Sequence, residues 1–586
     1  MMNTTADSTP LSVRHKLPNP CGAHVLARAL KRHGVEVLFG QSLPSALLLV
    51  IPEFGMRQVA YRTENAGAAM ADGYARASQK VAVVTAQNGP AAALLAPGLA
   101  EALKASVPIV AIVQDVRRNQ TDKNAFQELD HFDIFRGCAK WVRRVADASR
   151  IDDYVDMAFT AAASGRPGPA VLLCPQDLLL EAVKPDAREE RRASLGVYPL
   201  DRSVADPSRI EEAARLLAQA EHPLIVAGGG VHLSAAHEAL AHLQESACLP
   251  VATTSMGKGA VAETDALSLG VIGYFMGTRG MARHMRALID RADCVLFVGD
   301  RTNQNGTDSW TLFPHSATGA RYIHIDIDAQ EVGRNYEALR LVGDAKLTLA
   351  ALHEAMTRVD LGKRRAARSE VEQAIAAGKK AFQTEARAML NSDAVPIRPE
   401  RLMNDLQSVM TPNTQIVTDA SYASIWAMNY LTASYAGQRF LTGRGLAGLG
   451  WGFPAAIGAK IAHPAREVVC ITGDGAFAHM WSELETAVRM KTKVIIIVLN
   501  NQILGYQWHA EEVLYGNHTD ACQFAPVDHA AIARACGCEG VRVEKPAEFK
   551  PALERALRGE KTTVIDVMID PKAYPPLTLY EGKLGF

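Results

Sequence analysis

Asp474 and Asn501 are the two residues of this sequence best placed to bind a metal ion. Gly473-Asp474-Gly475 ends one apolar run, and Asn500-Asn501 ends the next, with residues 476–499 between them. The carboxyl ends of parallel strands meet at one edge of a sheet, where ligands bind. Mg²⁺ prefers oxygen ligands and takes one or two of them from protein side chains. The spacing therefore predicts a magnesium site made by Asp474, the Asn501 side chain and a backbone carbonyl near Ile503.

Glycines around this pair indicate that the metal binds together with a phosphate group. Gly475 lets the backbone approach a diphosphate closely, and the amides that open the following helix can bind its charge. Upstream, GLAGLGWGFPAAIG (445–458) combines glycines for tight turns with the start of a small-residue helix. Taken alone, each motif also fits an ordinary strand-to-loop turn or a Rossmann-like turn. Two such motifs on neighbouring strand ends favour a metal–diphosphate site.

The elements that must position these residues follow an alternating β/α pattern. Runs such as VAVVTA (81–86), PIVAIV (108–113) and VIIIVLNN (494–501) are almost entirely apolar, which is typical of strands buried on both faces of a parallel sheet. Charged stretches near residues 183–205 and 361–399 separate three units of domain size. We expect an α/β fold with three doubly wound parallel-sheet domains, over residues 14–190, 200–360 and 395–575.

The composition excludes several other classes of protein. The 586 residues are 48% hydrophobic and 21% charged with a formal net charge of −1, so neither a nucleic-acid partner nor an anionic membrane surface is expected. The sequence has no apolar run long enough to span a membrane and no apolar signal segment near its beginning. Nine scattered cysteines suggest buried reduced thiols. Together these features predict a cytoplasmic protein.

The motifs resemble those of the thiamine-diphosphate (ThDP)-dependent decarboxylase and carboligase superfamily over almost the whole chain. Asp474 through Asn501 resembles its ThDP-binding motif, and Arg62 through Arg76 resembles the segment that carries its catalytic glutamate. The acetolactate synthase (acetohydroxyacid synthase) large subunits are the most similar group, through the segments 125–128, 165–169, 227–230, 324–335 and 500–505. Gln87–Pro90 and Phe126–Asp130 look equally similar to the sulfoacetaldehyde acetyltransferases.

The resemblance implies a role for each domain and for particular residues. The first domain would bind the pyrimidine of ThDP, with Glu64 as the catalytic acid that hydrogen-bonds the ring, and the third would bind the diphosphate and Mg²⁺. Leu449 matches the bulky side chain that bends the cofactor, and Gln127 matches a position on the substrate side. The other residues that match cofactor contacts are Pro90, Ser421, Tyr422, Ala423, Gly448, Gly473, Gly475, Ala476, Leu504 and Gly505.

On the substrate side the chain departs from the acetolactate synthases. Their Pro-Gly-Gly loop is replaced by a stretch that includes Gln41 and Ser42, and their acceptor-binding arginine falls near Asn305. Trp508 matches a pocket tryptophan only with a shift in position, and Phe126 matches a substrate-side position. These differences put acetolactate formation in question and leave ThDP chemistry intact.

The middle domain resembles the part of acetolactate synthases that holds a non-redox FAD. The matching residues are Gly228, Gly229, Thr253, Thr254, Arg301, Asp326 and Asp328. The stretch 270–277, which would face the flavin, matches less well. The sequence therefore leaves FAD, a smaller nucleotide and an empty cleft open.

The resemblance implies a homodimer or homotetramer, in which Glu64 and Asp474 meet across a subunit boundary. The leading hypothesis is an acetolactate synthase-like transferase or lyase that decarboxylates pyruvate and transfers the two-carbon unit to an acceptor carbonyl. The alternatives are a ThDP lyase or acyltransferase that acts on a sulfonated aldehyde or a diketone, a flavin-reducing enzyme of the pyruvate oxidase type, and a non-catalytic ThDP-binding subunit. The sequence does not reveal whether a regulatory subunit binds. It also leaves open whether the aromatic tail (570–586) covers the site or packs on a neighbouring subunit.

Overall fold

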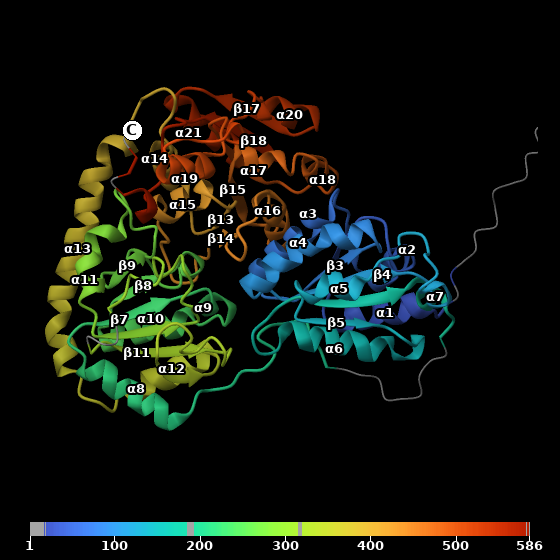
Figure 1. Cartoon of the computed structure of the whole chain (residues 1–586), viewed down its shortest axis with the longest axis horizontal. Coiled ribbons are helices and arrows are strands. Elements are labelled where there is room, and N and C mark those ends of the chain that lie inside the picture. The colour runs from blue at the N-terminus through green and yellow to red at the C-terminus, as the bar shows by residue number, and fades with distance from the viewer. Residues whose placement is uncertain (1–16, 18, 184–192, 315–318, 582, 585–586) are drawn as a thin grey trace, which may run out of the picture.

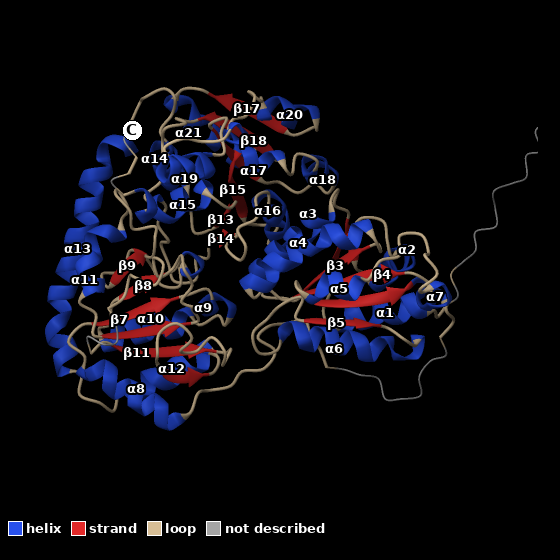
Figure 2. Ribbon diagram, in the orientation of Figure 1, coloured by secondary structure: helices blue, strands red, loops and turns tan. Residues whose placement is uncertain are grey.

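A computed structural model of the chain describes residues 17, 19–183, 193–314, 319–581 and 583–584. The expected limits of the first domain, residues 14 and 190, and part of the first charged stretch lie outside these ranges. Figure 1 shows three lobes, with the N-terminal lobe in blue and cyan, the middle lobe in green and the C-terminal lobe in orange and red. In each lobe the strands lie inside and the helices outside (Figure 2). The prediction of three parallel-sheet α/β domains is confirmed, because each lobe is built on one sheet of six parallel strands.

The N-terminal sheet has the strand order β2-β1-β3-β4-β6-β5. Its strands are β1 (Val37–Gly40), β2 (Arg57–Val59), β3 (Ala82–Ala86), β4 (Ile109–Asp115), β5 (Trp141–Arg144) and β6 (Ala170–Pro175). The helices around it are α1 (Gly22–Arg32), α2 (Ser45–Val50), α3 (Glu64–Ser78), α4 (Pro90–Ala105), α5 (His131–Arg136), α6 (Ile151–Ala163) and α7 (Gln176–Leu180). β3 and β4 are buried along their whole length, as expected for strands covered by helices on both faces.

The middle sheet has a different order, β12-β11-β10-β7-β8-β9. Its strands are β7 (Pro223–Ala227), β8 (Val251–Thr253), β9 (Ser268–Val271), β10 (Cys294–Val298), β11 (Arg321–Asp326) and β12 (Leu339–Val342). Its helices are α8 (Pro207–Gln219), α9 (Gly230–Leu233), α10 (His237–Ala247), α11 (Arg286–Asp290) and α12 (Ala345–Met356). This is the order of dinucleotide-binding folds, which bind ligands where the strand order reverses, here between β7 and β10.

The C-terminal sheet, β14-β13-β15-β16-β18-β17, repeats the order of the N-terminal sheet strand for strand. Its strands are β13 (Thr414–Thr418), β14 (Leu441–Thr442), β15 (Glu467–Gly473), β16 (Ile495–Asn500), β17 (Glu539–Val543) and β18 (Thr563–Met568). Its helices are α14 (Pro399–Val409), α15 (Tyr422–Tyr430), α16 (Gly452–Ala462), α17 (Asp474–Ala478), α18 (Glu483–Arg489), α19 (Gly505–Tyr515), α20 (His529–Ala535) and α21 (Pro546–Arg558). The first and third domains therefore share a topology that their sequences do not reveal.

The lobes are joined by a connecting helix and by the packing of one helix pair. The second charged stretch forms α13 (Gly362–Leu390), which runs along the outer edge of the middle lobe towards the C-terminal lobe (Figure 1). α3 of the N-terminal lobe packs on α16 of the C-terminal lobe. A Cβ atom at Gly73 would lie 2.1 Å from the Ala455 carbonyl oxygen, and one at Gly458 would lie 1.9 Å from that of Met70. Glycine at both positions lets the two backbones touch, so these lobes are held at a fixed distance.

Candidate active site

A cavity of about 540 Å³ opens at the carboxyl edge of the C-terminal sheet. It lies where the strand order reverses, between β13 and β15, the place at which open parallel sheets bind ligands. It is lined by twelve of the residues expected at the cofactor: Ser421, Tyr422, Ala423, Leu449, Gly473, Asp474, Gly475, Ala476, Asn501, Ile503, Leu504 and Gly505. These residues are spread over 85 positions of the sequence, and the sheet brings them to one wall.

Asp474 is a buried carboxylate at the end of β15. Its two oxygens accept hydrogen bonds from the backbone amides of Gly475 (2.9 Å) and Gln502 (2.7 Å). Burial raises its pKa from 3.8 to about 7, and it forms no ion pair with any basic side chain that the structure describes. A buried carboxylate without a cation is costly. A divalent ion at this position would remove that cost.

Asn501 and Ile503 lie beside Asp474, in the loop that follows β16. The Asn501 side-chain oxygen accepts a bond from the Ile503 amide at 3.3 Å. One carboxylate, one amide oxygen and the loop carbonyls form a set of hard oxygen donors, which suits Mg²⁺ when phosphate and water complete the shell. Gly473, directly before Asp474, has no atom within 4 Å of an added Cβ. The backbone is therefore open where a diphosphate would need space, and the residues fit a metal–diphosphate pair.

Leu449 lies on the cavity wall in a loop that two buried carboxylates hold. Glu101 of α4, in the N-terminal lobe, accepts bonds from the amides of Gly445 (2.6 Å), Leu446 (2.6 Å) and Ala447 (3.1 Å). On the other side of Leu449, Asp419 accepts from the amides at positions 450 (3.1 Å) and 452 (3.0 Å). No sequence motif indicated Glu101 or Asp419. The position of Asp419 directly after an apolar strand was the one available signal.

Most N-terminal candidates gather at the equivalent edge of the first sheet. Gln41 and Ser42 follow β1, and Pro90 opens α4 after β3. Gln127 is held there because the Asn88 side chain donates to its carbonyl oxygen at 3.0 Å. Glu64 is the first residue of α3 and is 8% exposed, and burial raises the pKa of its carboxyl group. None of these five residues lines the cavity of the C-terminal sheet.

Three further candidates lie away from the cavity wall. Phe126 is 85% exposed. The Trp508 ring packs on His518, with ring centroids 4.3 Å apart. Gly448 is in the loop with Leu449 but is not among the lining residues. Within one chain, therefore, the structure brings twelve expected cofactor residues to one wall and leaves Glu64 and the other N-terminal candidates at the edge of a different sheet.

The cavity is also lined by Asn305, which the sequence placed on the substrate side, and by three residues that were not expected there, Tyr274, Arg444 and Tyr506. Tyr274 and Asn305 reach it from the middle lobe, Arg444 from the glycine-rich loop and Tyr506 from α19. The aromatic tail packs behind them, since the Thr578 amide donates to the Tyr274 carbonyl oxygen at 3.0 Å. The tail thus packs on its own chain, between the middle and C-terminal lobes. No motif marks the three unexpected residues because each comes from a different element.

A second crevice lies at the reversal point of the middle sheet, between β7 and β10. The expected nucleotide residues Gly229, Thr254, Arg301 and Asp326 line it, whereas Gly228, Thr253 and Asp328 do not. Burial raises the pKa of Asp326 to about 6.

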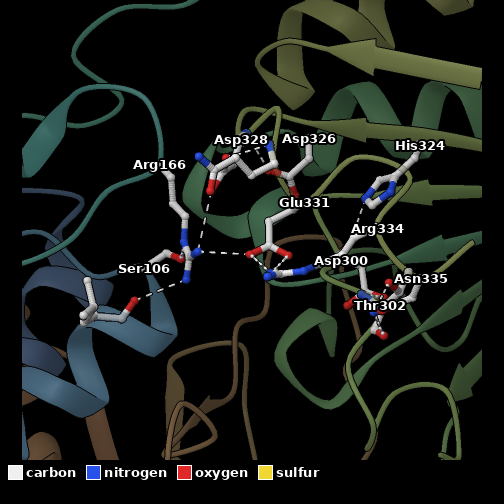
Figure 3. A network of polar contacts seen from close by, with 12 residues as sticks. Ser106, Arg166, Asp300, Thr302, His324, Asp326, Asp328, Glu331, Arg334 and Asn335 are labelled. Atoms are coloured by element: carbon white, nitrogen blue, oxygen red, sulfur yellow. Dashed lines mark hydrogen bonds and ion pairs between the residues drawn. The ribbon is translucent and has the colours of Figure 1, made fainter. Parts of the chain in front are cut away.

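Arg166 of the N-terminal lobe crosses this crevice (Figure 3). Its guanidinium lies 3.3 Å from the Glu331 carboxylate and 3.6 Å from that of Asp328, and it donates to the Ser106 hydroxyl at 2.9 Å. The enclosed volume is about 110 Å³. The donor set suits a nucleotide, but a dinucleotide would need Arg166 to move.

Comparison with known families defines the class of the protein. Three descriptions of thiamine pyrophosphate (TPP, another name for ThDP) enzymes match: the N-terminal TPP binding domain over residues 21–134, the central domain over 210–352 and the C-terminal TPP binding domain over 419–567. Each match falls within one of the three lobes. The third contains every C-terminal residue expected at the cofactor.

Curated relatives match over nearly the full length. A "Probable acetolactate synthase large subunit" of Methanococcus aeolicus is 33% identical over 94% of this chain and 92% of its own. "Acetolactate synthase" of Arthrospira platensis is 32% identical over 94% and 95%. "Acetolactate synthase isozyme 3 large subunit" of Escherichia coli K12 is 30% identical over 94% and 95%. The chain belongs to the acetolactate synthase large-subunit family of the thiamine pyrophosphate enzymes.

Within the described ranges, no helix combines the length and apolar composition needed to cross a membrane.

Proposed function

We propose that the chain is a ThDP- and Mg²⁺-dependent enzyme, a transferase or lyase, that decarboxylates pyruvate and transfers the two-carbon unit to an acceptor carbonyl. The observation that carries this proposal is the cavity between β13 and β15, where Asp474, Asn501 and Leu449 share one wall. The names of the full-length relatives support the same chemistry. The nine cysteines are unpaired thiols, which suits a reducing compartment such as the cytoplasm.

The C-terminal residues would bind and orient the cofactor. Asp474, Asn501 and the Ile503 carbonyl would hold Mg²⁺, and the glycines around Asp474 would let the diphosphate approach the backbone. Leu449 would support the cofactor from the cavity wall. When bound, ThDP supplies a nucleophilic carbon that adds to a carbonyl and an electron sink for the pair released on C–C cleavage.

Glu64 would hold a proton at the pyrimidine ring of the cofactor. A carboxyl group whose pKa is raised by burial suits that task, because it holds its proton more readily than an exposed carboxyl group does. Its own chain does not bring it to the cavity, so we propose that the Glu64 edge of a second copy completes each site. Phe126 and Leu94 of that edge are 85% and 52% exposed, as expected of apolar side chains that a partner covers. A homodimer is then the smallest functional unit.

A second candidate function is a lyase or acyltransferase that acts on another carbonyl compound, such as a sulfonated aldehyde. Asn305 favours it, because this neutral amide lines the cavity at the position where the family resemblance leads us to expect a cation. Products made from pyruvate, sulfoacetaldehyde and 2,3-butanedione would distinguish the two functions. Bleaching of a bound flavin by pyruvate without oxygen would instead indicate a redox enzyme.

We further propose that the middle crevice binds a nucleotide. Its reversal-point location and the Asp326 carboxylate support this. Mass spectrometry of small molecules released from the purified protein would identify FAD or a smaller nucleotide. We expect an Arg166→Ala variant to retain less nucleotide, since it removes a cation that lines the crevice and could contact the phosphate groups.

The test of the main proposal is pyruvate consumption by the purified protein with ThDP and Mg²⁺, followed by NMR. We expect turnover that depends on both additions and falls at least about 100-fold in Glu64→Gln, because a general acid–base group contributes on that order. Glu370→Gln, a change at an exposed carboxylate of α13, is the matched control. Unchanged turnover in Glu64→Gln would contradict the assigned role.

A further inference from the structure

Arg444 has a special position on the wall of the active-site cavity. It comes from the loop between β14 and Leu449 and lines the cavity together with Tyr274, Asn305 and Tyr506. Arg444 and Asn305 also line the middle crevice, so they lie between the two cavities. Among the described residues that line the cavity, Arg444 is the one cation and Asp474 the one anion. Asp474 is committed to the metal in the proposed function. The charge of Arg444 therefore has no counterpart on this wall.

The hydrogen bonds of Arg444 leave part of its guanidinium free. One terminal nitrogen donates to the Ser424 hydroxyl, and the group lies over the Phe275 ring, 5.1 Å from its centroid. Its Nε is buried and has no hydrogen-bond partner. In the part of the chain that the structure describes, no carboxylate lies within ion-pair distance of it. A guanidinium that forms no ion pair is suited to a charge-assisted contact with an anion.

The surroundings of Arg444 do not neutralise it. Burial lowers its pKa, with Tyr274, Tyr506 and Glu101 acting in the opposite direction. Burial raises the pKa of Tyr274 to about 12, so this hydroxyl is neutral. The Glu101 carboxylate is already bonded to three amides of the loop. A buried cation without a counterion is costly, and an anionic ligand would remove that cost.

We propose that Arg444, with the hydroxyl groups of Tyr274 and Tyr506, binds the acidic group of the substrate. The ligand class is a small carbonyl compound that carries a carboxylate or a sulfonate. This inference rests on the proposed function, since it assumes that the cavity is the reaction site. It assigns substrate selection to a residue from the glycine-rich loop, a few positions from Leu449.

Equilibrium binding tests this assignment without turnover. The probes are pyruvate, the sulfonate isethionate and neutral 2,3-butanedione, titrated calorimetrically into ThDP- and Mg²⁺-loaded protein that carries Glu64→Gln. We expect Arg444→Gln to weaken binding of the preferred anion about 10- to 100-fold, the range of a charge-assisted hydrogen bond. Arg444→Lys should recover part of the affinity, and butanedione binding should not change. Arg534→Gln, which removes a half-exposed cation on α20, controls for net charge.

The preferred anion identifies the substrate class. Tighter binding of pyruvate, lost in Arg444→Gln, supports a carboxylate, and tighter binding of isethionate, lost in the same variant, supports a sulfonate. Equal anion affinity in wild type and Arg444→Gln would overturn the proposal. So would a loss of ThDP affinity in Arg444→Gln as large as the loss of anion affinity, because Arg444 would then bind the diphosphate. If the wild type binds an anion through Arg444 but does not consume pyruvate, the anion site stands and the proposed reaction fails.

Discussion

At the scale of the residue, burial determines what each candidate can do. Asp474 carries a raised pKa because burial excludes water from it, and among the described residues it forms no ion pair with Arg444, the cation that lines the same cavity. Leu449, in contrast, acts through shape, because an aliphatic side chain can contribute only its volume to the cavity wall. The same wall thus needs one charged and one apolar residue, and their effects can be separated by mutation.

We predict that Leu449→Ala binds ThDP about as well as wild type but turns over about 10- to 100-fold more slowly. A small misplacement of a reacting group costs on that order, while the diphosphate contacts remain. Measuring both ThDP affinity and kcat for the variant separates an effect on binding from an effect on turnover. Leu446→Ala is the control, since that side chain lies in the same loop, is 56% exposed and is outside the cavity. Equal losses of affinity and kcat in Leu449→Ala would indicate a binding role instead.

At the scale of the element, the loop between β14 and α16 depends on acids from two other elements. Glu101 holds it from α4, and Asp419 holds it from the end of β13. Because Leu449 lies between the two sets of bonds, its position is set by both lobes. Burial raises the pKa of Asp419 to about 6, but four hydrogen bonds to its carboxylate favour the charged form.

We predict that Glu101→Gln lowers the free energy of unfolding by about 1–3 kcal/mol, because the amide group turns a donor towards backbone N–H donors. Hydrogen exchange of residues 443–452 should become faster in the protein without ThDP. Asp419→Asn should also make hydrogen exchange faster, at the other end of the loop. Exchange rates equal to those of wild type in both variants would show that the loop holds its shape by itself.

The contacts of His509, on α19, predict that the stability of the folded protein depends on pH. The Tyr422 hydroxyl lies 2.7 Å from His509 Nδ1 and donates to the Tyr580 hydroxyl at 3.1 Å. Burial lowers the pKa of His509 from 6.5 to about 4, against the opposing effects of the Pro571 carbonyl, Glu512 and Asp570. Because this pKa is lower in the folded protein, the histidine of the unfolded chain takes up a proton at a higher pH than that of the folded chain. The stabilisation is therefore complete above pH 6.5 and is lost as the pH falls towards 4.

Protonation of His509 lowers the free energy of unfolding by at most about 3 kcal/mol as the pH falls from 6.5 towards 4. Denaturant unfolding of wild type and His509→Gln at pH 7.5 and pH 5 isolates it from the other buried histidines. We expect the wild type to lose more stability than the variant on acidification. An identical loss in both proteins would exclude His509 as the titrating group.

At the scale of the whole molecule, the repeated topology places the candidate residues at two separate sheet edges. The first and third sheets have the same strand order, and each presents candidate residues at its own carboxyl edge. α3 and α16 fix the two lobes through the contacts at Gly73 and Gly458. The Glu64 edge is not part of the wall of its own chain's cavity, so a second copy is the simplest way to join the two halves of the site.

A mixture of two inactive variants tests this arrangement. Glu64→Gln and Asp474→Ala should each be inactive, but co-refolded in equal amounts they should recover roughly a quarter of the wild-type activity. Half of the dimers would be mixed, and each mixed dimer would have one intact site. Failure to recover activity, with mixed dimers present by native mass spectrometry, would place Glu64 and Asp474 in the site of a single chain.

The sequence by itself determined the α/β class, the three sheets and the residues at the carboxyl ends of β15 and β16. Apolar runs and the residues that follow them are local features, so their meaning does not depend on distant contacts. Only the tertiary structure decided that Glu101 supports the loop of Leu449, that Arg444 faces the cavity beside Asn305 and that the tail packs on its own chain. These contacts join elements far apart in the sequence, and each depends on how the lobes pack. A single sequence carries no pattern that records such packing.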